Sequence, residues 1–221
     1  MKKVGLLLSG CGVLDGTEIH ETVITILALQ SRECVEVKFL APNIEQSVVM
    51  NHRNNNPLLQ ERRNVLIESA RIARGDIKDM KELNIKEIDG LIIPGGAGVI
   101  LNLCTFANDG IKCRVNPDVE GLIVQCLEAK KPIGVLCIAP VLIAKILSQN
   151  NKRANLTIGK DPKIAEAIKK LGSTHILCET TDIVFDKENN ILSTPAYMLG
   201  KDIHEVSKGI TKLINKLLEL L

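Results

Sequence analysis

The sequence predicts an α/β protein with a mostly parallel sheet covered by helices on both faces. Three short runs, residues 4–9, 89–94 and 132–136, are rich in apolar residues and have the length of buried strands. Segments with helical spacing of apolar residues separate these runs along the chain. Strands that alternate with helices in this way form parallel sheets with both faces buried.

The first unit is a strand, a glycine loop and a helix. Residues 4–9 form the strand, which stops at Ser9-Gly10-Cys11-Gly12. Either Asp15 or Thr17 can cap the helix that follows. Its apolar residues recur at helical spacing and are Ile19, Val23, Ile26, Leu27 and Leu29.

The second unit contains a long polar segment. Residues 35–40 are predicted to form a strand that Ala41-Pro42 ends. Residues 43–60 are about as long as unstructured loops become, which indicates a functional flap or an insertion. Residues 61–74 are predicted to form an amphipathic helix with Gly75 as its C-cap. The side chains expected to face inward are Val65, Ile67, Ala70 and Ile72.

The remaining segments complete the sheet and its helices. A predicted helix over residues 119–129 precedes the strand at 132–136, which leads into Cys137 and a helix over 140–147. The last third is predicted to hold short strands at 156–158, 175–178, 183–185 and 191–193, a turn at 187–190 and a final helix at 201–220. With 221 residues, the chain has the length expected for one α/β domain.

Composition and charge exclude a nucleic-acid partner. Lys and Arg number 28 and Asp and Glu number 26, and the two signs are interspersed, so the sequence contains no basic stripe for phosphates. Three phenylalanines and one tyrosine provide little surface on which bases could stack. We therefore expect a small molecule or a protein as the partner.

The chain is predicted to be a cytoplasmic protein without a metal site. No apolar run approaches the roughly 20 residues that a membrane span needs, and polar residues follow the first run too soon for a secretory signal. The seven cysteines are scattered and odd in number, so reduced thiols are expected. No two of them have C-x-x-C spacing, which argues against structural zinc.

Cys137 is the main candidate for a nucleophile. It follows a buried strand in Lys131-Pro-Ile-Gly-Val-Leu-Cys-Ile-Ala-Pro140, where the last proline opens a helix. This arrangement resembles a nucleophile elbow, which exposes the side chain above the sheet and aims it at a helix N-terminus. The alternative is that Cys137 is a small buried apolar residue, as most cysteines are. Its position alone leaves both interpretations open.

Two glycines and one further amide are candidates for binding an oxyanion. Gly95 and Gly96 have no side chain to block a ligand, so their amides, with the amide of Ile138, could stabilise a bound oxygen. The alternative is that the two glycines only form a tight turn.

A thiol nucleophile also needs a group that moves protons. Glu18 and Glu21 would both lie near the first turn of the early helix, although acidic residues there often serve only the helix dipole. No local spacing selects a histidine among the four in the chain, which are His20, His52, His175 and His204.

Four segments form a combination that is more specific than any one motif. They are residues 9–21, Ile93-Pro94-Gly95-Gly96, Val135-Leu136-Cys137-Ile138-Ala139-Pro140 and Thr194-Pro195-Ala196-Tyr197-Met198. Together they resemble the ElbB-type glyoxalases of the PfpI-like, class I glutamine amidotransferase-like superfamily, and the mitochondrial ES-one proteins of eukaryotes look like relatives. The resemblance covers essentially the whole chain.

The resemblance implies a flavodoxin-like three-layer sandwich, one class I glutamine amidotransferase-like domain over residues 1–221, and a homodimer. It also implies a glyoxalase that converts small 2-oxoaldehydes, methylglyoxal and glyoxal, to hydroxy acids without glutathione, metal or cofactor. Carried onto this chain, the nucleophile is Cys137 and its carboxylate partner is Glu21. The oxyanion donors implied are the amides of Gly96 and Ile138.

The sequence differs from the related peptidases and glutamine amidotransferases at positions that their activities need. In the peptidase branch a histidine follows the nucleophile, whereas this chain has Ile138, which argues against proteolysis. Glutamine amidotransferases have a residue and then glycine after their cysteine, and a late His-x-Glu pair. Here the second position is Ala139 and the late pair is the adjacent His204-Glu205, so ammonia release from glutamine is disfavoured.

The protonation state of Glu21 determines whether it can stabilise the Cys137 thiolate. An ionised Glu21 would repel the thiolate and raise its pKa, whereas a protonated Glu21 could donate a hydrogen bond to it. We therefore expect a protonated Glu21 at rest, and attack of Cys137 on the aldehyde to give a hemithioacetal that Glu21 helps to rearrange.

Two other functions stay open at this point. Cys137 could be an oxidisable thiol of a redox-sensing or regulatory binding protein, because a reactive thiolate is also prone to oxidation. A binding subunit linked to isoprenoid biosynthesis is suggested by the family's association with that pathway, although no residue argues for it.

Overall fold

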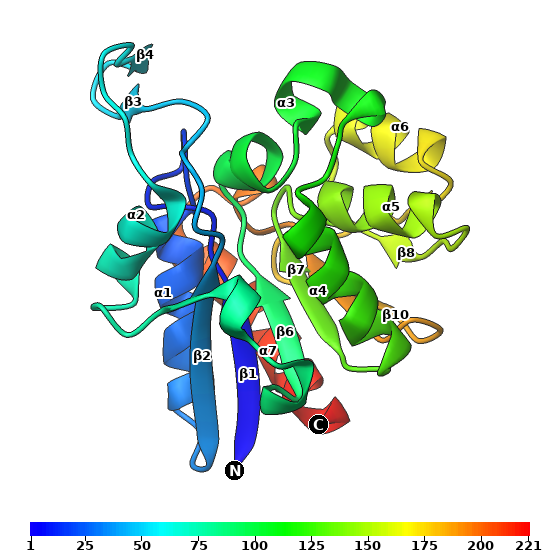
Figure 1. The fold of residues 1–221 in the computed structure, drawn as a ribbon. Coiled ribbons are helices and arrows are strands. Elements are labelled where there is room, and N and C mark those ends of the chain that lie inside the picture. The colour runs from blue at the N-terminus through cyan, green and yellow to red at the C-terminus, as the bar shows by residue number, and fades with distance from the viewer.

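The computed structural model describes residues 1–221 as a sheet of seven strands with helices packed around it (Figure 1). The strand order is β10-β11-β7-β6-β1-β2-β5, and every pairing is parallel except the one between β10 and β11. The strands are β1 (Lys2–Leu7), β2 (Val35–Ala41), β5 (Lys78–Asp79), β6 (Gly90–Ile93), β7 (Ile133–Leu136), β10 (Val184–Asp186) and β11 (Ile191–Thr194).

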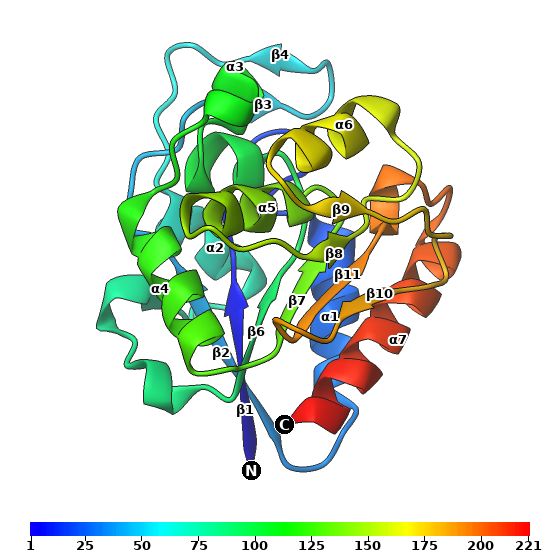
Figure 2. The ribbon, with the colours of Figure 1, turned by 90° about the vertical axis from the view of Figure 1, so that its right-hand side faces the viewer.

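Helices cover both faces of the sheet (Figure 2). α1 packs along α7 on one face, and α4 and α5 lie together on the other. The helices are α1 (Ile19–Gln30), α2 (Val65–Ile72), α3 (Phe106–Asp109), α4 (Pro117–Glu128), α5 (Pro140–Gln149), α6 (Pro162–Lys170) and α7 (Ile203–Leu220). This arrangement confirms the predicted three-layer α/β fold. None of the helices has the length and apolar character needed to cross a membrane.

The middle of the sheet is buried on both faces, which explains why its strands are apolar throughout. Leu6 in β1 and Leu91 in β6 have no exposed surface. Gly134 in β7 allows α7 to pack close, because a Cβ there would lie 2.8 Å from Cδ2 of Leu213. The core therefore extends from the central strands directly into α7.

The parallel order brings several loops together at one edge of the sheet. β11, β7, β6 and β1 are neighbours in that order, so the segments that follow their carboxyl ends are neighbours too. In open parallel sheets this is the edge where ligands bind. The segments that meet there begin at Leu8, Pro94, Cys137 and Pro195.

The buried face of α1 is partly polar, which apolar periodicity did not reveal. Ile19, Val23 and Leu27 are 40%, 51% and 69% exposed, whereas Thr22 and Thr25 are fully buried. Both threonine hydroxyls donate to backbone carbonyls one turn earlier in the chain, so they are satisfied without water. The periodic residues thus identified the helix, but of the five only Leu29 is fully buried.

The polar segment at residues 43–60 has more structure than the predicted unstructured loop. It contains a hairpin of β3 (Met50–Asn51) and β4 (Asn56–Pro57), and an isolated bridge joins Glu45 to Asn64. The sequence shows no alternation there because these short strands are not packed on a core. Hydrogen bonds to other loops, described below, hold the segment instead.

α2 is shorter than the predicted helix over residues 61–74. It begins after Asn64, whose side chain accepts a hydrogen bond from the amide of Ile67 at 3.1 Å. Ile67, expected to face inward, is 64% exposed, while Glu68 and Ser69 are buried. Ser69 is buried because its hydroxyl accepts a hydrogen bond from the amide of Gly10.

The last third contains a helix that the sequence analysis missed. α6 follows Asp161, which caps it, and Ile168 is its only fully buried residue. The strands expected near residues 156 and 175 form a separate two-stranded sheet of β8 (Asn155–Leu156) and β9 (Thr174–His175). Neither strand joins the main sheet.

Candidate active site

Cys137 lies at a sharp turn between β7 and α5. Its φ is +59°, a left-handed conformation that is uncommon and strained for a residue with a side chain. Its amide donates to the carbonyl of Thr194 in β11 at 3.1 Å, and α5 begins three residues later at Pro140. The strand, the turn and the helix start therefore form the elbow that the sequence predicts. The residue itself is 8% exposed.

Glu21 is fully buried in the first turn of α1. Its carboxylate oxygens are held by two amides, from Gly95 to Oε2 at 2.8 Å and from Tyr197 to Oε1 at 3.1 Å. Glu18, the other acidic candidate, is instead the N-cap of α1, and its carboxylate accepts from the amide of Glu21 at 2.6 Å. Glu18 therefore caps the helix, whereas Glu21, one turn later, provides the buried carboxyl.

Gly95 brings Glu21 and Cys137 together. A Cβ at Gly95 would lie 2.4 Å from Cβ and 2.9 Å from Sγ of Cys137, and 2.6 Å from Oε2 of Glu21. No side chain fits between them, so this position requires glycine for space. The amide of Gly95, expected among the oxyanion donors, is already engaged by Glu21.

The amides of Gly96 and Ile138 point at the thiol. Hydrogen bonding from both amides acts to lower the pKa of Cys137. Gly96 has a φ of +98°, and a Cβ there would lie 2.4 Å from the nitrogen of Glu18 and from the carbonyl oxygen of Gly16. The glycine is therefore required where the β6 loop crosses the start of α1. These two amides are placed to stabilise negative charge beside Sγ.

Burial controls the protonation of the pair. Burial raises the pKa of Glu21 to about 7, against the opposing effect of the Tyr197 and Gly95 amides. Burial, and then the charge of Glu21, raise the pKa of Cys137 well above its ordinary value. Near neutral pH the thiol therefore keeps its proton, while the carboxyl lies near the middle of its titration. The carboxyl is positioned to accept the thiol proton when sulfur attacks an electrophile.

The segment after β11 supplies one contact that the sequence did not assign. Ala196 has a φ of +45°, and the amide of the next residue, Tyr197, binds Glu21. Strained backbone of this kind is concentrated at functional sites. The Tyr197 hydroxyl lies 3.0 Å from Nδ1 of His20. His20 therefore borders the site, although it makes no contact with Cys137.

The other three histidines lie away from the pair. Nε2 of His52 accepts a hydrogen bond from the amide of Leu14 at 3.2 Å, and Nε2 of His175 accepts one from Ile158 at 3.4 Å. His204 is exposed in the first turn of α7. Cys137 and Glu21 thus form a pair and not part of a triad with a histidine.

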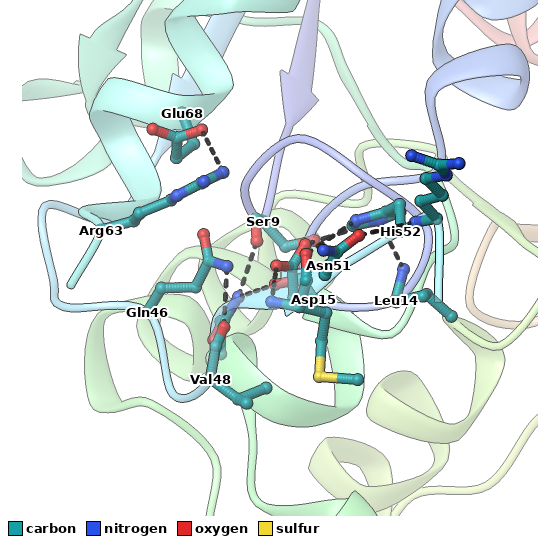
Figure 3. A network of polar contacts seen from close by, with 12 residues as sticks. Ser9, Leu14, Asp15, Gln46, Val48, Asn51, His52, Arg63 and Glu68 are labelled. Atoms are coloured by element: carbon teal, nitrogen blue, oxygen red, sulfur yellow. Dashed lines mark hydrogen bonds and ion pairs between the residues drawn. The ribbon is translucent and has the colours of Figure 1, made fainter. Parts of the chain in front are cut away.

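The hairpin segment clamps the glycine loop that leads into α1 (Figure 3). Asp15 is 2% exposed, accepts from the amide of Met50 at 2.7 Å, and lies 3.7 Å from Nε2 of His52. Figure 3 shows the same His52 ring against the amide of Leu14. The hairpin therefore supports the site indirectly, by fixing the loop before Glu18.

Asn102 links three segments around the same loop. Its Nδ2 donates to the carbonyls of Ser9 at 2.9 Å and Asp15 at 2.8 Å. Its Oδ1 accepts from the amide of Ser47 at 2.9 Å. Asn102 belongs to a π-helix, η3 (Val99–Leu103), which follows the Gly95–Gly98 loop, and π-helices are frequent at functional sites.

The fold and the cysteine elbow define an α/β protein of the amidotransferase-like class. The solved structure of an isoprenoid biosynthesis protein with amidotransferase-like domain from Ehrlichia chaffeensis is similar over 99% of both chains, with a TM-score of 0.92 and 36% identity. No protein-family model matches the chain.

The chain belongs to the ES1 family of glutamine amidotransferase-like class 1 proteins. It is 43% identical over 227 residues to the ES1 protein homolog, mitochondrial, of Rattus norvegicus, covering 99% of this chain and 84% of the relative. It is 44% identical over 227 residues to the human glutamine amidotransferase-like class 1 domain-containing protein 3, mitochondrial, covering 99% of this chain and 83% of the relative.

These relatives contradict the predicted cytoplasmic location, because both are named as mitochondrial proteins. The prediction was wrong because it rested on the lack of a sustained apolar run near Met1. That feature argues against a secretory signal or a membrane span only. Transport into an organelle depends on amphipathic, arginine-rich segments, for which apolar runs are no test.

Proposed function

We propose that this protein is a glutathione-independent glyoxalase that converts small 2-oxoaldehydes to hydroxy acids through a hemithioacetal on Cys137. The observation that supports this most directly is the buried carboxyl of Glu21 beside the thiol, with the amides of Gly96 and Ile138 also directed at the sulfur. This arrangement provides a nucleophile, a proton acceptor and a site for an oxyanion without any further group.

The reacting form has an ionised Glu21, unlike the protonated resting Glu21 expected from the sequence, because the thiol keeps its own proton at neutral pH. In the first step, Sγ of Cys137 forms a bond to the aldehyde carbon of methylglyoxal while its proton passes to Glu21. The carbonyl oxygen becomes an oxyanion, stabilised by the two amides, and then takes the proton back from Glu21. The product is a neutral hemithioacetal, and Glu21 is ionised again. The pKa of Glu21 near 7 suits this exchange, because both protonation states are accessible at neutral pH.

In the second step, Glu21 removes the hydrogen from the carbon bound to sulfur, giving an enediolate. Glu21 returns that proton to the neighbouring carbon, and the hydroxyl proton of the former aldehyde oxygen moves to the neighbouring oxygen, which leaves a thioester of lactic acid on Cys137. Water hydrolyses the thioester and restores the thiol. The sum is methylglyoxal plus water to lactic acid, and no oxidant or reductant is consumed.

A purified-protein assay tests this function. Methylglyoxal loss and lactate formation are measured together without glutathione, because aldehyde loss alone also reports reaction with surface lysines. We expect Cys137→Ala to abolish lactate formation and Glu21→Gln to reduce it by about 100-fold or more. Cys126→Ala, a buried cysteine in α4, is the control and should retain activity. Lactate formation by Cys137→Ala would overturn the mechanism.

The redox-sensing function has less structural support at Cys137. A sensor thiol is exposed and has a lowered pKa, whereas Cys137 is 8% exposed and burial raises its pKa. An enzyme can still use such a thiol, since Glu21 accepts its proton during attack. The geometry therefore favours the glyoxalase over the sensor.

A homodimer is part of the proposal. Ile19, Val23 and Leu27 follow one another at four-residue spacing along α1 and are all substantially exposed. Such an apolar stripe on a helix is typical of an interface between copies of a chain. We expect sedimentation analysis to show a dimer for the unmodified chain and a monomer for Leu27→Glu. A monomer for the unmodified chain would overturn this part of the proposal.

A further inference from the structure

The side chains of His20 and Tyr197 meet at the edge of the candidate active site. Nδ1 of His20 lies 3.0 Å from the hydroxyl oxygen of Tyr197, and the two ring centroids are 5.8 Å apart. His20 belongs to the first turn of α1, and Tyr197 belongs to the short 3-10 helix η5 (Ala196–Met198), 177 positions later in the chain. The proposed reaction assigns no role to either side chain.

Tyr197 is attached to α1 at two points. Its amide donates to Oε1 of Glu21 at 3.1 Å, while its hydroxyl contacts His20. His20 and Glu21 are consecutive residues, so the two contacts connect one residue of η5 to adjacent residues of α1. Contacts at opposite ends of the tyrosine restrict both the position of its backbone and the direction of its ring.

The backbone of η5 needs support from outside the turn. Ala196 has a φ of +45°, in the left-handed region that is unfavourable for a residue with a Cβ. The amide of Met198 closes the turn onto the carbonyl of Pro195 at 3.0 Å, but that bond does not reach α1. Strained backbone persists only where surrounding contacts hold it. The contact with His20 is the one hydrogen bond that a side chain of η5 makes.

This contact is compatible with either charge state of His20. A neutral imidazole can accept the hydroxyl proton at Nδ1, and an imidazolium donates from Nδ1 to the hydroxyl oxygen. Burial, and then the charges of Glu18, Glu21 and Asp202, raise the pKa of Tyr197, so its hydroxyl keeps its proton at neutral pH. The contact is therefore available throughout the pH range in which Glu21 titrates.

The amide of Tyr197 affects the charge of Glu21. Burial raises the pKa of Glu21 to about 7, and among the groups that oppose this rise the Tyr197 amide acts most strongly. The amide of Gly95 and the thiol of Cys137 oppose it less, and the charge of Glu18 adds to it. Loss of the Tyr197 amide would therefore raise the pKa of Glu21 further and leave less ionised carboxylate at neutral pH.

We propose that His20 and the Tyr197 hydroxyl are positioning groups, whose contact holds the turn at Ala196 so that the amide of Tyr197 stays on Glu21. The inference rests on the proposed function in one respect, namely that Glu21 accepts the thiol proton. Neither side chain has a hydrogen bond to Cys137, so their influence on the reaction passes through Glu21. Removal of either partner frees the amide to move away and reduces the ionised fraction of the carboxyl.

The first experiment measures the titration midpoint of Glu21. Glutamate labelled with ¹³C at the side-chain carboxyl is titrated by NMR, and the signal that is absent from Glu21→Gln is assigned to Glu21. Tyr197→Phe, which keeps the ring, and His20→Ala should both move the midpoint to higher pH. His20→Asn, whose side chain can place a polar atom close to the position of Nδ1, should keep the midpoint of the unmodified chain. His204→Ala, at an exposed site in the first turn of α7, is the control and should also leave it in place.

The second experiment follows the amide itself by hydrogen exchange. Exchange of the residue 197 amide should be several-fold faster in Tyr197→Phe and in His20→Ala, because the amide spends less time on Glu21. A Glu21 midpoint that is unchanged or lower in either variant would overturn the proposal, and so would unchanged exchange at residue 197. Both readouts are taken without substrate, so a chain without glyoxalase activity tests the proposal equally well.

Kinetics then separate positioning from substrate binding. In lactate formation from methylglyoxal, His20→Ala should lower kcat at pH 7 several-fold, move the acidic limb of the pH profile to higher pH, and leave KM close to that of the unmodified chain. A raised KM with the Glu21 midpoint in place would show that His20 binds the aldehyde instead, which contradicts the positioning role.

Discussion

Oε2 of Glu21 accepts a hydrogen bond from the amide of Gly95 at 2.8 Å, so the candidate acid is fixed to the loop that also borders Cys137. The contact joins residues 74 positions apart in the chain. It orients the carboxyl toward the sulfur and leaves the adjacent amide, that of Gly96, directed at the thiol. The relationship between these two residues gives direct predictions.

Gly95→Ala should separate the pair. The new Cβ would overlap Cys137 and Glu21, so one of them must move, and displacements of about 1 Å at a catalytic group cost roughly 100-fold in rate. Lactate formation from methylglyoxal measures the loss. Gly121→Ala in α4 is the matched control, because a Cβ there meets nothing within 4 Å. Full activity of Gly95→Ala would show that the close approach is unimportant.

The stability of the protein should fall as the pH rises from about 4.5 to about 7. The folded-state pKa of Glu21 is raised, so in this range the folded chain binds a proton that the unfolded chain has released. The full shift corresponds to about 3 kcal/mol of unfolding free energy. Urea unfolding at pH 5 and pH 8 measures it. Glu21→Gln should lose this pH dependence, and an unchanged slope in that variant would assign it to other groups.

Alkylation should reveal the influence of Glu21 on the thiol. Burial and the charge of Glu21 both raise the pKa of Cys137, so removing the charge in Glu21→Gln should move the midpoint of the pH profile for reaction with iodoacetamide to lower pH. Peptide mapping follows Cys137, and the exposed Cys34 in the same sample is the internal standard. A midpoint that stays in place or moves to higher pH in Glu21→Gln would contradict the electrostatic account.

Asn102→Ala should destabilise the glycine loop. The substitution leaves the carbonyls of Ser9 and Asp15 and the amide of Ser47 without their partner, at about 1 to 3 kcal/mol for each group that stays buried. We expect a clear loss of unfolding free energy and faster proteolysis within residues 43–60. Asn108→Ala, at an exposed site in α3, is the control. Equal stability of the two variants would refute the role of Asn102.

Sequence reasoning predicted the parts of the fold where burial repeats along the chain. β6 and β7 are apolar over their whole length because both faces are buried, and the helix after Cys137 is apolar and buried over its first five residues. It missed α6, which buries one residue, and it gave the wrong exposure for Ile67. At α2 polar contacts, such as the one between Ser69 and Gly10, and not apolar area, decide which residues are inside.

The candidate site likewise contains one residue that the sequence could predict and one contact that it could not. Cys137 could be singled out because the strand, the turn residue and the proline that opens the helix are contiguous. The contact of Tyr197 with Glu21 could not, because it uses a backbone amide 176 positions away and depends on the left-handed backbone of Ala196. A positive φ at a residue other than glycine leaves no mark in composition or periodicity.

The orientation of the Glu21 carboxylate depends on two amides that lie far from it in the chain. One comes from the middle of the sequence, at Gly95, and the other from Tyr197 near its end. An amino-terminal fragment would therefore carry Glu21 and the glycine loop yet leave the carboxylate without the donors that orient it. The Tyr197 donor is in place only when the segment after β11 packs against α1, so the environment of Glu21 depends on β11 having joined the sheet.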